Sequence, residues 1–385
     1  MRKNNEFFVV LFFLSVFMLL SFNRFFINYI FFGSILVISV ILILVSGLKV
    51  RVLKNSYFFI LLVLWCFLSI FWSVAPNITF KSVEYLIIVL LLGISFVNRY
   101  PKEKIVMILM LYCLLISVLN LGSISFLKDL SLDQDDRYTV YKGLFNHKNN
   151  LGKYMAICIL VSLWGIFHKL DKKWMVINNI TLVCASICLF LSKSSTAISV
   201  LLITLIFMIG FRIVKSKKVS IITFVVVFIT SIYSIVNMPD WLRFLIQSVF
   251  KKDVTFTGRS VIWEVVKEKI YDAPYIGYGY ESFWTEEYFV SEMYKYFFFK
   301  QAHAHNGFLD LILAIGLIGL MIYIVMVFKF LRNCVSTKIE SRYLIISLNL
   351  FVFIWMINLL ETDLIYPYSM FFLLQFFAFH IVTEE

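Results

Sequence analysis

Long apolar runs restrict the possible folds of this sequence more than any other feature. A membrane-spanning helix needs about 20 mostly apolar residues. Twelve stretches fit that requirement, at approximately 6–22, 26–47, 56–75, 83–98, 105–122, 149–167, 175–192, 196–213, 219–237, 306–330, 342–360 and 364–382. With 61% hydrophobic and 15% charged residues, the composition excludes an ordinary soluble domain. We therefore expect an all-α polytopic membrane protein with about 12 transmembrane helices, forming a single membrane domain over residues 1–385.

The loops between these runs differ in charge. If the N-terminus is cytoplasmic, the cytoplasmic segments hold nineteen Lys and Arg residues, whereas the short outer loops hold only Arg24, Lys81 and Lys193. Membrane proteins keep positive charge on the cytoplasmic side, so both termini are predicted to be cytoplasmic. The net charge of +12 then follows from topology, and no nucleic-acid partner is expected. Two long loops, about 123–148 and 238–304, fall on the external side.

Two groups of polar residues lie at helix starts on this external side. His147, Lys148 and Asn149 precede the run 149–167, where a helix start offers donors to an anion. An ordinary loop-to-helix junction would have the same composition. Lys193 and Ser194 belong to a hydroxyl-rich stretch before the run 196–213, which also fits a simple helix cap.

The second long loop divides by charge. Residues 241–270 hold six basic against three acidic side chains and suit a phosphate, whereas residues 271–300 hold two against five and suit a neutral polyol. From about residue 258, apolar residues recur at helical spacing and predict a short amphipathic helix on the membrane surface. On this helix Trp263 lies one turn from Arg259 and could brace its guanidinium by stacking. A guanidinium is well suited to holding a phosphate because it offers two parallel donors.

The acidic half is also rich in aromatic residues, among them Tyr280 and Trp284. Tyr and Trp anchor proteins at the membrane interface, and they also stack on sugar rings, so one surface could do both.

A group of histidines precedes the run 306–330. His303, His305 and Asn306 lie together there, and histidine is the natural proton acceptor near neutral pH. With His147, the two histidines could also ligate a metal. No Cys or clustered carboxylate completes such a site, so neither a metal nor another cofactor is expected. Charged residues near the outer ends of the runs, among them Lys153, indicate a polar cavity that opens to the outside.

In these motifs the sequence resembles the O-antigen ligase and polymerase superfamily of bacterial envelope glycosyltransferases. His305-Asn306, followed after nine residues by Gly316-Leu-Ile-Gly319, is similar to the histidine motif of that family. Three more segments look closest to exopolysaccharide polymerases of the succinoglycan type: Gly143…His147-Lys148-Asn149…Gly152, Thr257-Gly258-Arg259…Trp263 and Pro274…Trp284. The similar motifs lie between about 143 and 319. Ser195 stands where many members have Arg or Lys, so Lys193, or Arg259 with Lys148, would have to supply that charge.

The resemblance implies a glycosyltransferase of the bacterial cytoplasmic membrane whose active site faces the periplasm or exterior. Its donor would be an oligosaccharide on undecaprenyl pyrophosphate, and its acceptor a second repeat unit in a polymerase or a lipid core in a ligase. A flippase and a chain-length regulator would be its protein partners. A polymerase is favoured over a ligase. A flippase or transporter is the alternative from another class, which would predict charges near the midplane or an internal repeat.

The implied mechanism assigns roles to individual residues. His305 would take the proton from the acceptor hydroxyl, and Arg259, helped by Lys148, would stabilise the departing pyrophosphate. The remaining residues expected to bind substrate are His147, Asn149, Lys193, Ser194, Trp263, Tyr280, Trp284, His303 and Asn306.

Overall fold

The computed structural model describes residues 2–22, 29–133, 139–214, 259–285, 302–336, 339–367 and 369–383, with a few more between 218 and 230. Within these ranges every regular element is helical except one antiparallel strand pair, β1 (Leu132–Asp133) and β2 (Val140–Tyr141). Most of the predicted span 219–237, the Thr257-Gly258 pair and the aromatic residues of the stretch 286–301 lie outside the described residues.

The helices follow the predicted apolar runs. Seven of them are long and apolar enough to cross a membrane, and four shorter ones are also apolar. The protein is therefore a polytopic helical membrane protein, as predicted. In chain order the helices are α1 (Arg2–Phe22), α2 (Tyr29–Ser46), α3 (Val50–Leu68), η1 (Ser69–Trp72), α4 (Pro76–Arg99), α5 (Lys102–Phe126), α6 (Lys128–Ser131), α7 (Lys148–Phe167), α8 (Lys172–Ser192), α9 (Ser195–Ile213), α12 (Arg259–Asp272), α14 (Gly307–Ser336), α15 (Ser341–Ile357) and α16 (Met370–Ile381).

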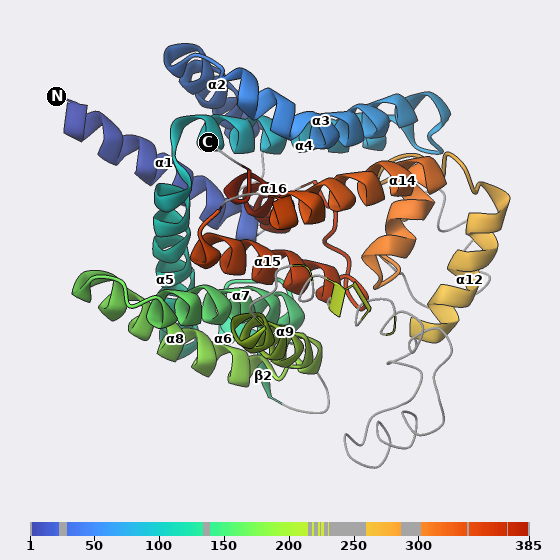
Figure 1. The fold of residues 1–385 in the computed structure, drawn as a ribbon. Helices are drawn as coiled ribbons and strands as arrows, with labels where there is room; N and C mark the ends of the chain where they lie inside the picture. Colours follow the sequence, from blue (N-terminus) through green and yellow to red (C-terminus); the bar gives the residue numbers. More distant parts are fainter. Residues whose placement is uncertain are drawn as a thin grey trace.

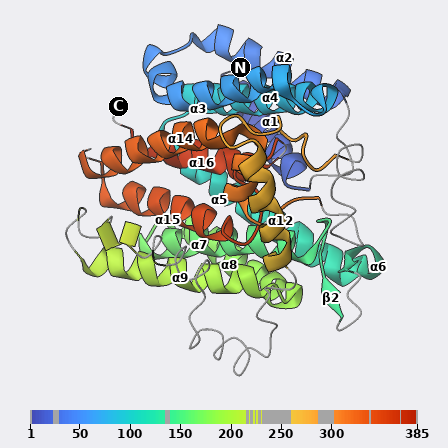
Figure 2. The ribbon, with the colours of Figure 1, turned by 90° about the vertical axis from the view of Figure 1, so that its right-hand side faces the viewer.

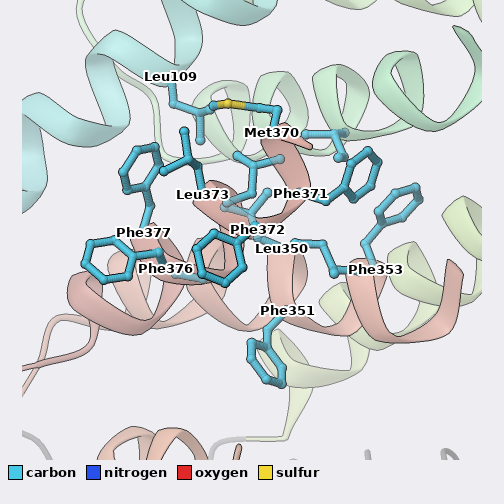
Figure 3. Close-up of a cluster of buried hydrophobic side chains, with 14 of the residues drawn as sticks. Leu109, Leu350, Phe351, Phe353, Met370, Phe371, Phe372, Leu373, Phe376 and Phe377 are labelled. Carbon is cyan, nitrogen blue, oxygen red and sulfur yellow. The ribbon is translucent and has the colours of Figure 1, made fainter. Parts of the chain in front are cut away.

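The helices stack in three layers (Figures 1 and 2). The blue layer of α2, α3 and α4 lies on one side, the green layer of α7, α8 and α9 on the other, and the orange and red helices α14, α15 and α16 fill the middle. Every residue of α16 is buried, as is α15 from Tyr343 onward. A helix that is apolar all round is expected to be enclosed in this way. Figure 3 shows how closely the Phe and Leu side chains of these two helices pack.

The long helix α14 is interrupted at Gly316, where φ is 69° and ψ is −174°. The break exposes backbone groups that an unbroken helix would pair internally. The loop after α12 supplies partners for them, because the N–H groups of Tyr278 and Gly279 donate to the carbonyls of Leu313 and Ala314 at 2.8 and 2.9 Å. These two hydrogen bonds attach the glycine-rich aromatic loop to α14 near its break. They also hold the loop residues after Gly279 in place.

The predicted amphipathic helix exists as α12, but its environment differs from the prediction. Its apolar residues Ile262, Val265 and Val266 are buried against Phe283 and Leu313. We expected this face to lie on the membrane surface; protein covers it instead, because the loop attached to α14 supplies a closer apolar partner. Figures 1 and 2 show α12 running across one end of the helical layers.

Candidate active site

A polar cavity of about 480 Å³ lies where α7, α14 and α16 begin and α15 ends. Five separate stretches of the chain contribute to its wall. They supply Ser21; Asn146, His147, Asn149, Asn150, Lys153 and Tyr154; Gly279, Glu281, Phe283 and Trp284; Ala302, His303, His305, Asp310, Leu313 and Ala314; and Glu361, Thr362, Asp363, Tyr366 and Ser369. Titratable side chains thus gather at one end of an otherwise apolar bundle, which is the usual composition of an active site.

The two histidines belong to a tight turn before α14. His305 has φ of 53°, an uncommon conformation for a residue other than glycine, and its N–H donates to Nδ1 of His303 at 3.3 Å. The two rings lie edge to face, with centroids 4.1 Å apart. Asn306 ends the turn as the cap of α14, since its Oδ1 accepts from the N–H groups of Phe308 and Leu309. Nδ1 of His305 is buried and has no hydrogen-bond partner among the described residues.

Both imidazoles are neutral at physiological pH. Burial lowers the pKa of His305 to about 3, and the neighbouring charges of His303 and Arg259 add to the effect. Burial likewise lowers the pKa of His303 to about 4. The pKa of His147 is also lowered, again mainly by burial. A neutral imidazole can accept a proton from a substrate hydroxyl, as a general base must.

Glu361, in the loop between α15 and α16, connects Arg259 to the cavity. Its Oε1 accepts from Nη2 of Arg259 at 3.0 Å and from Nδ2 of Asn149 at 2.9 Å, while Oε2 lies 4.0 Å from Nζ of Lys153. The other guanidinium arm, Nη1, donates to the carbonyl of Leu360. Burial alone would raise the pKa of Glu361, but the charges of Lys153 and Arg259 outweigh it and hold that pKa below its ordinary value. The carboxylate is therefore ionised and links α12 and α7 to the loop between α15 and α16.

Lys153 is the buried cation of the cavity wall. Only 4% of its side chain is exposed, and its ammonium forms an ion pair with Asp363. Burial raises the pKa of Asp363, and the charge of Lys153 opposes that rise. Sequence reasoning proposed Lys193, or Arg259 with Lys148, to supply the charge missing at Ser195; among the described Lys and Arg residues, the one that lines the cavity is Lys153.

The close approach of α9 to α7 depends on Gly152. A Cβ at that position would lie 2.6 Å from Cβ of Ser194, so no larger residue fits without a shift. Across this contact Oγ of Ser194 donates to Oδ1 of Asn149 at 3.2 Å. Ser194 precedes α9 but makes no side-chain cap bond. Its hydroxyl instead orients the amide that holds Glu361.

Two further carboxylates line the cavity. Asp310 accepts from Nε1 of Trp284 at 2.7 Å, from the N–H of Ala304 and from Oγ1 of Thr362 at 2.6 Å, so it holds three wall segments together. Glu281 adopts φ of 59°, and burial, reinforced by the charge of Asp310, raises its pKa to about 8. At neutral pH it is therefore mostly protonated and can donate a hydrogen bond, as a carboxylic acid in an apolar site can.

The structure brings most of the predicted residues together. Of the twelve, those that line the cavity are His147, Asn149, Trp284, His303 and His305. Arg259 and Ser194 each contact a residue of the wall, and Asn306 caps the helix that follows the histidine turn.

The other four predicted residues also lie outside the cavity lining. Trp263 donates from Nε1 to the carbonyl of Ala304 at 2.9 Å, and Arg259 donates to Glu361, while the stacking of the indole on the guanidinium stays a prediction. Tyr280 is fully buried, with its hydroxyl donating to a backbone carbonyl. Lys193 follows the last residue of α8 and has a left-handed backbone conformation. The backbone N–H of Lys148 donates to the carboxylate of Asp133.

Sequence reasoning missed the acidic contribution from the loop between α15 and α16. Glu361, Thr362 and Asp363 all line the cavity. The available signal was a short polar insertion between the apolar runs 342–360 and 364–382. Glu281 was counted only as one of several acids in the loop, because its burial depends on the attachment of that loop to α14.

Comparisons with known proteins show distant similarity to one family. The O-antigen ligase family model matches residues 180–324, which include α12, Glu281 and the histidine turn. The exopolysaccharide production protein ExoQ of Rhizobium meliloti is 24% identical over 364 residues, covering 88% of this chain and 80% of that protein. A Rickettsia felis protein, provisionally named a polysaccharide ligase, is 24% identical over 337 residues, covering 83% of this chain and 80% of that protein. A ComP-specific O-oligosaccharyltransferase of Acinetobacter baylyi is 24% identical over 320 residues, covering 76% of this chain and 55% of that protein. Residues 180–324 of the chain thus match the O-antigen ligase family, and over most of its length the chain is distantly similar to an exopolysaccharide production protein and to polysaccharide ligases.

Proposed function

We propose that this protein is a polysaccharide polymerase. It joins oligosaccharide repeat units carried on undecaprenyl pyrophosphate, at the outer leaflet of the cytoplasmic membrane. The observation that supports this most directly is the polar cavity, where neutral His303 and His305 share one wall with the buried cation Lys153. The relationship to an exopolysaccharide production protein favours this reaction within the family.

The cavity is proposed to face the cell exterior. Basic residues, among them Lys49, Arg51, Arg99 and Lys102, gather at the opposite end of the bundle, in the turns between α2 and α3 and between α4 and α5. In Figure 1 the N-terminus and the α4–α5 turn lie at the left, and α12 lies at the right. Because positive charge is retained on the cytoplasmic side, this arrangement supports cytoplasmic termini and an external cavity.

In the proposed reaction an acceptor hydroxyl attacks the anomeric carbon of the donor sugar. A new C–O bond forms there, the bond from that carbon to the pyrophosphate oxygen breaks, and the hydroxyl proton passes to His305. Burial keeps the pKa of His305 low, and a bound diphosphate raises it, because a nearby negative charge favours the imidazolium. The histidine thus becomes a stronger base once the donor is bound.

The leaving diphosphate is stabilised by the cations at the cavity wall. Lys153 lines the cavity directly, whereas Arg259 acts beside it, through the carboxylate of Glu361. Protonated Glu281 can donate a hydrogen bond to a sugar or phosphate oxygen without repelling the anion. Fixed groups that match the charge developing in the transition state are the usual source of such catalysis.

A ligase that transfers the glycan to a lipid core is the second candidate. Relatives named a polysaccharide ligase and an O-oligosaccharyltransferase favour it, and the chemistry at the donor would be the same. The two reactions differ only in the acceptor, so the shape of the donor site does not separate them.

Reconstitution of the purified protein with a lipid-linked oligosaccharide tests both candidates. Long products formed without a separate acceptor support the polymerase, whereas transfer only to an added lipid core supports the ligase. Donor that stays unchanged under both conditions would refute glycosyl transfer. Movement of intact donor across the bilayer would instead show a flippase.

A further inference from the structure

A second pocket lies at the end of the bundle opposite to the cavity. It has a volume of about 240 Å³ and is formed by the turn before α3, the turn between α4 and α5, and the end of α16. Among the described residues that line it there is no acid, whereas its cations are Lys49, Arg51, Arg99 and Lys102. We call this site the basic pocket.

The wall of the basic pocket is rigidly built. Asn98, which is 1% exposed, accepts from the N–H of Lys49 at 2.9 Å and donates to Oγ of Ser46 and to the carbonyl of Gly47, both also at 2.9 Å. These three bonds fix the turn that carries Lys49 against the end of α4. The backbone position from which Lys49 extends is therefore set by the fold.

The charges of the pocket are incompletely balanced by the described residues. Lys49 and Arg51 form no ion pair with any of them, and Arg99 reaches only Glu6, at 3.4 Å. Tyr100 lines the pocket and is 4% exposed, and the guanidinium of Arg99 lies 5.8 Å from the centroid of its ring. A group of cations with few acidic partners suits a ligand that carries several negatively charged oxygens.

We propose that the basic pocket binds a phosphate group, independently of the reaction in the cavity. If the basic end is cytoplasmic, anionic phospholipids of the adjoining leaflet present such phosphates at high local concentration. A soluble phosphate compound offers the same chemistry. The turn held by the buried Asn98 and the pocket beside Tyr100 distinguish this site from the diffuse positive charge expected at any cytoplasmic helix end.

Binding is tested on the purified full-length protein in a zwitterionic detergent. Thermal stability is measured as phosphatidylglycerol, phosphatidylcholine or inorganic phosphate is added, since a ligand of the native state raises the Tm with concentration. The test variant is Lys49→Gln with Arg51→Gln. The matched control is Lys54→Gln with Arg332→Gln, which removes two exposed basic residues that do not line the pocket.

We expect phosphatidylglycerol, but not phosphatidylcholine, to stabilise the wild type. The test variant should bind it roughly 30-fold more weakly, because two cation contacts are lost. The control variant should bind it like the wild type. Binding of inorganic phosphate without binding of phosphatidylglycerol would identify a soluble phosphate as the ligand and still support the site.

Three results would overturn the proposal. The first is that neither probe binds. The second is that the test and control variants lose binding equally, which would indicate diffuse surface charge. The third is that Glu384→Gln with Glu385→Gln strengthens binding of both probes tenfold or more. The last outcome would show that the acidic residues after Thr383 in the sequence are the anion that the basic pocket holds.

Discussion

Replacing Arg259 by Lys tests whether the two arms of the guanidinium, rather than its charge alone, organise the cavity. Nη1 donates to the carbonyl of Leu360 and Nη2 to Glu361 at 3.0 Å, so two adjacent residues of one loop are held by a single side chain. An ammonium keeps the charge but cannot reach both acceptors in the same geometry. The loop that places Glu361 and Asp363 in the cavity wall should then lose one of its two attachments to α12.

The expected magnitude follows from the burial of the pair. Only 12% of the Arg259 side chain and 7% of the Glu361 side chain are exposed, so solvent screens the interaction little. A hydrogen bond to a charged group contributes about 1.5–3 kcal/mol, so losing one costs about 2 kcal/mol. If that bond holds the catalytic geometry, the rate should fall roughly 30-fold.

The assay is polymer formation by reconstituted enzyme, with Tm measured on the same preparations. Arg212→Lys is the matched control, because Arg212 lies over the ring of Phe167, away from the cavity. A double-mutant cycle with Glu361→Gln should give strong coupling, since the two residues share the bond being broken. Wild-type rate and stability in Arg259→Lys, or additive effects in the cycle, would show that the two-armed contact is unimportant.

Three further predictions concern the histidine turn, the acid at 281 and the break in α14. His305→Ala should lower polymer formation at least about 100-fold while the amount of protein in the membrane stays unchanged. His168→Ala, at the far end of α7, should not lower it. Near-normal polymer formation by the first variant would exclude His305 as the base. Because folding raises the pKa of Glu281 from 4.5 to about 8, its contribution to stability is complete below pH 4.5 and is lost as the pH rises through 8. Glu281→Gln should therefore flatten the alkaline decline in Tm, and an unchanged profile would contradict its burial as an acid. Gly316→Ala should lower the free energy of unfolding by about 2 kcal/mol or more, because φ there is 69° and a Cβ would collide with the carbonyl of Tyr275. Gly210→Ala, with open space around it, should be tolerated. Equal Tm values for the two variants would argue against the break in α14.

The helices were predictable because each depends on its own stretch of sequence. The length of each apolar run and the charge of each loop determine whether and in which orientation a segment crosses the bilayer. Neither property requires knowledge of neighbouring helices. The same holds for α12, whose buried residues Ile262, Val265 and Val266 repeat at helical spacing. The face that α12 would bury was predictable, but the surface that covers it was not.

The sequence by itself therefore determined a polytopic helical membrane protein with His303 and His305 in a polar turn before α14. Only the tertiary structure decided which charges share the cavity with them. Glu361 and Asp363 enter it because the loop between α15 and α16 folds over the starts of α7 and α14, and Lys153 enters it because it pairs with Asp363 there. Side chains more than two hundred residues apart meet through helix packing, and spacing along the chain contains no record of that contact.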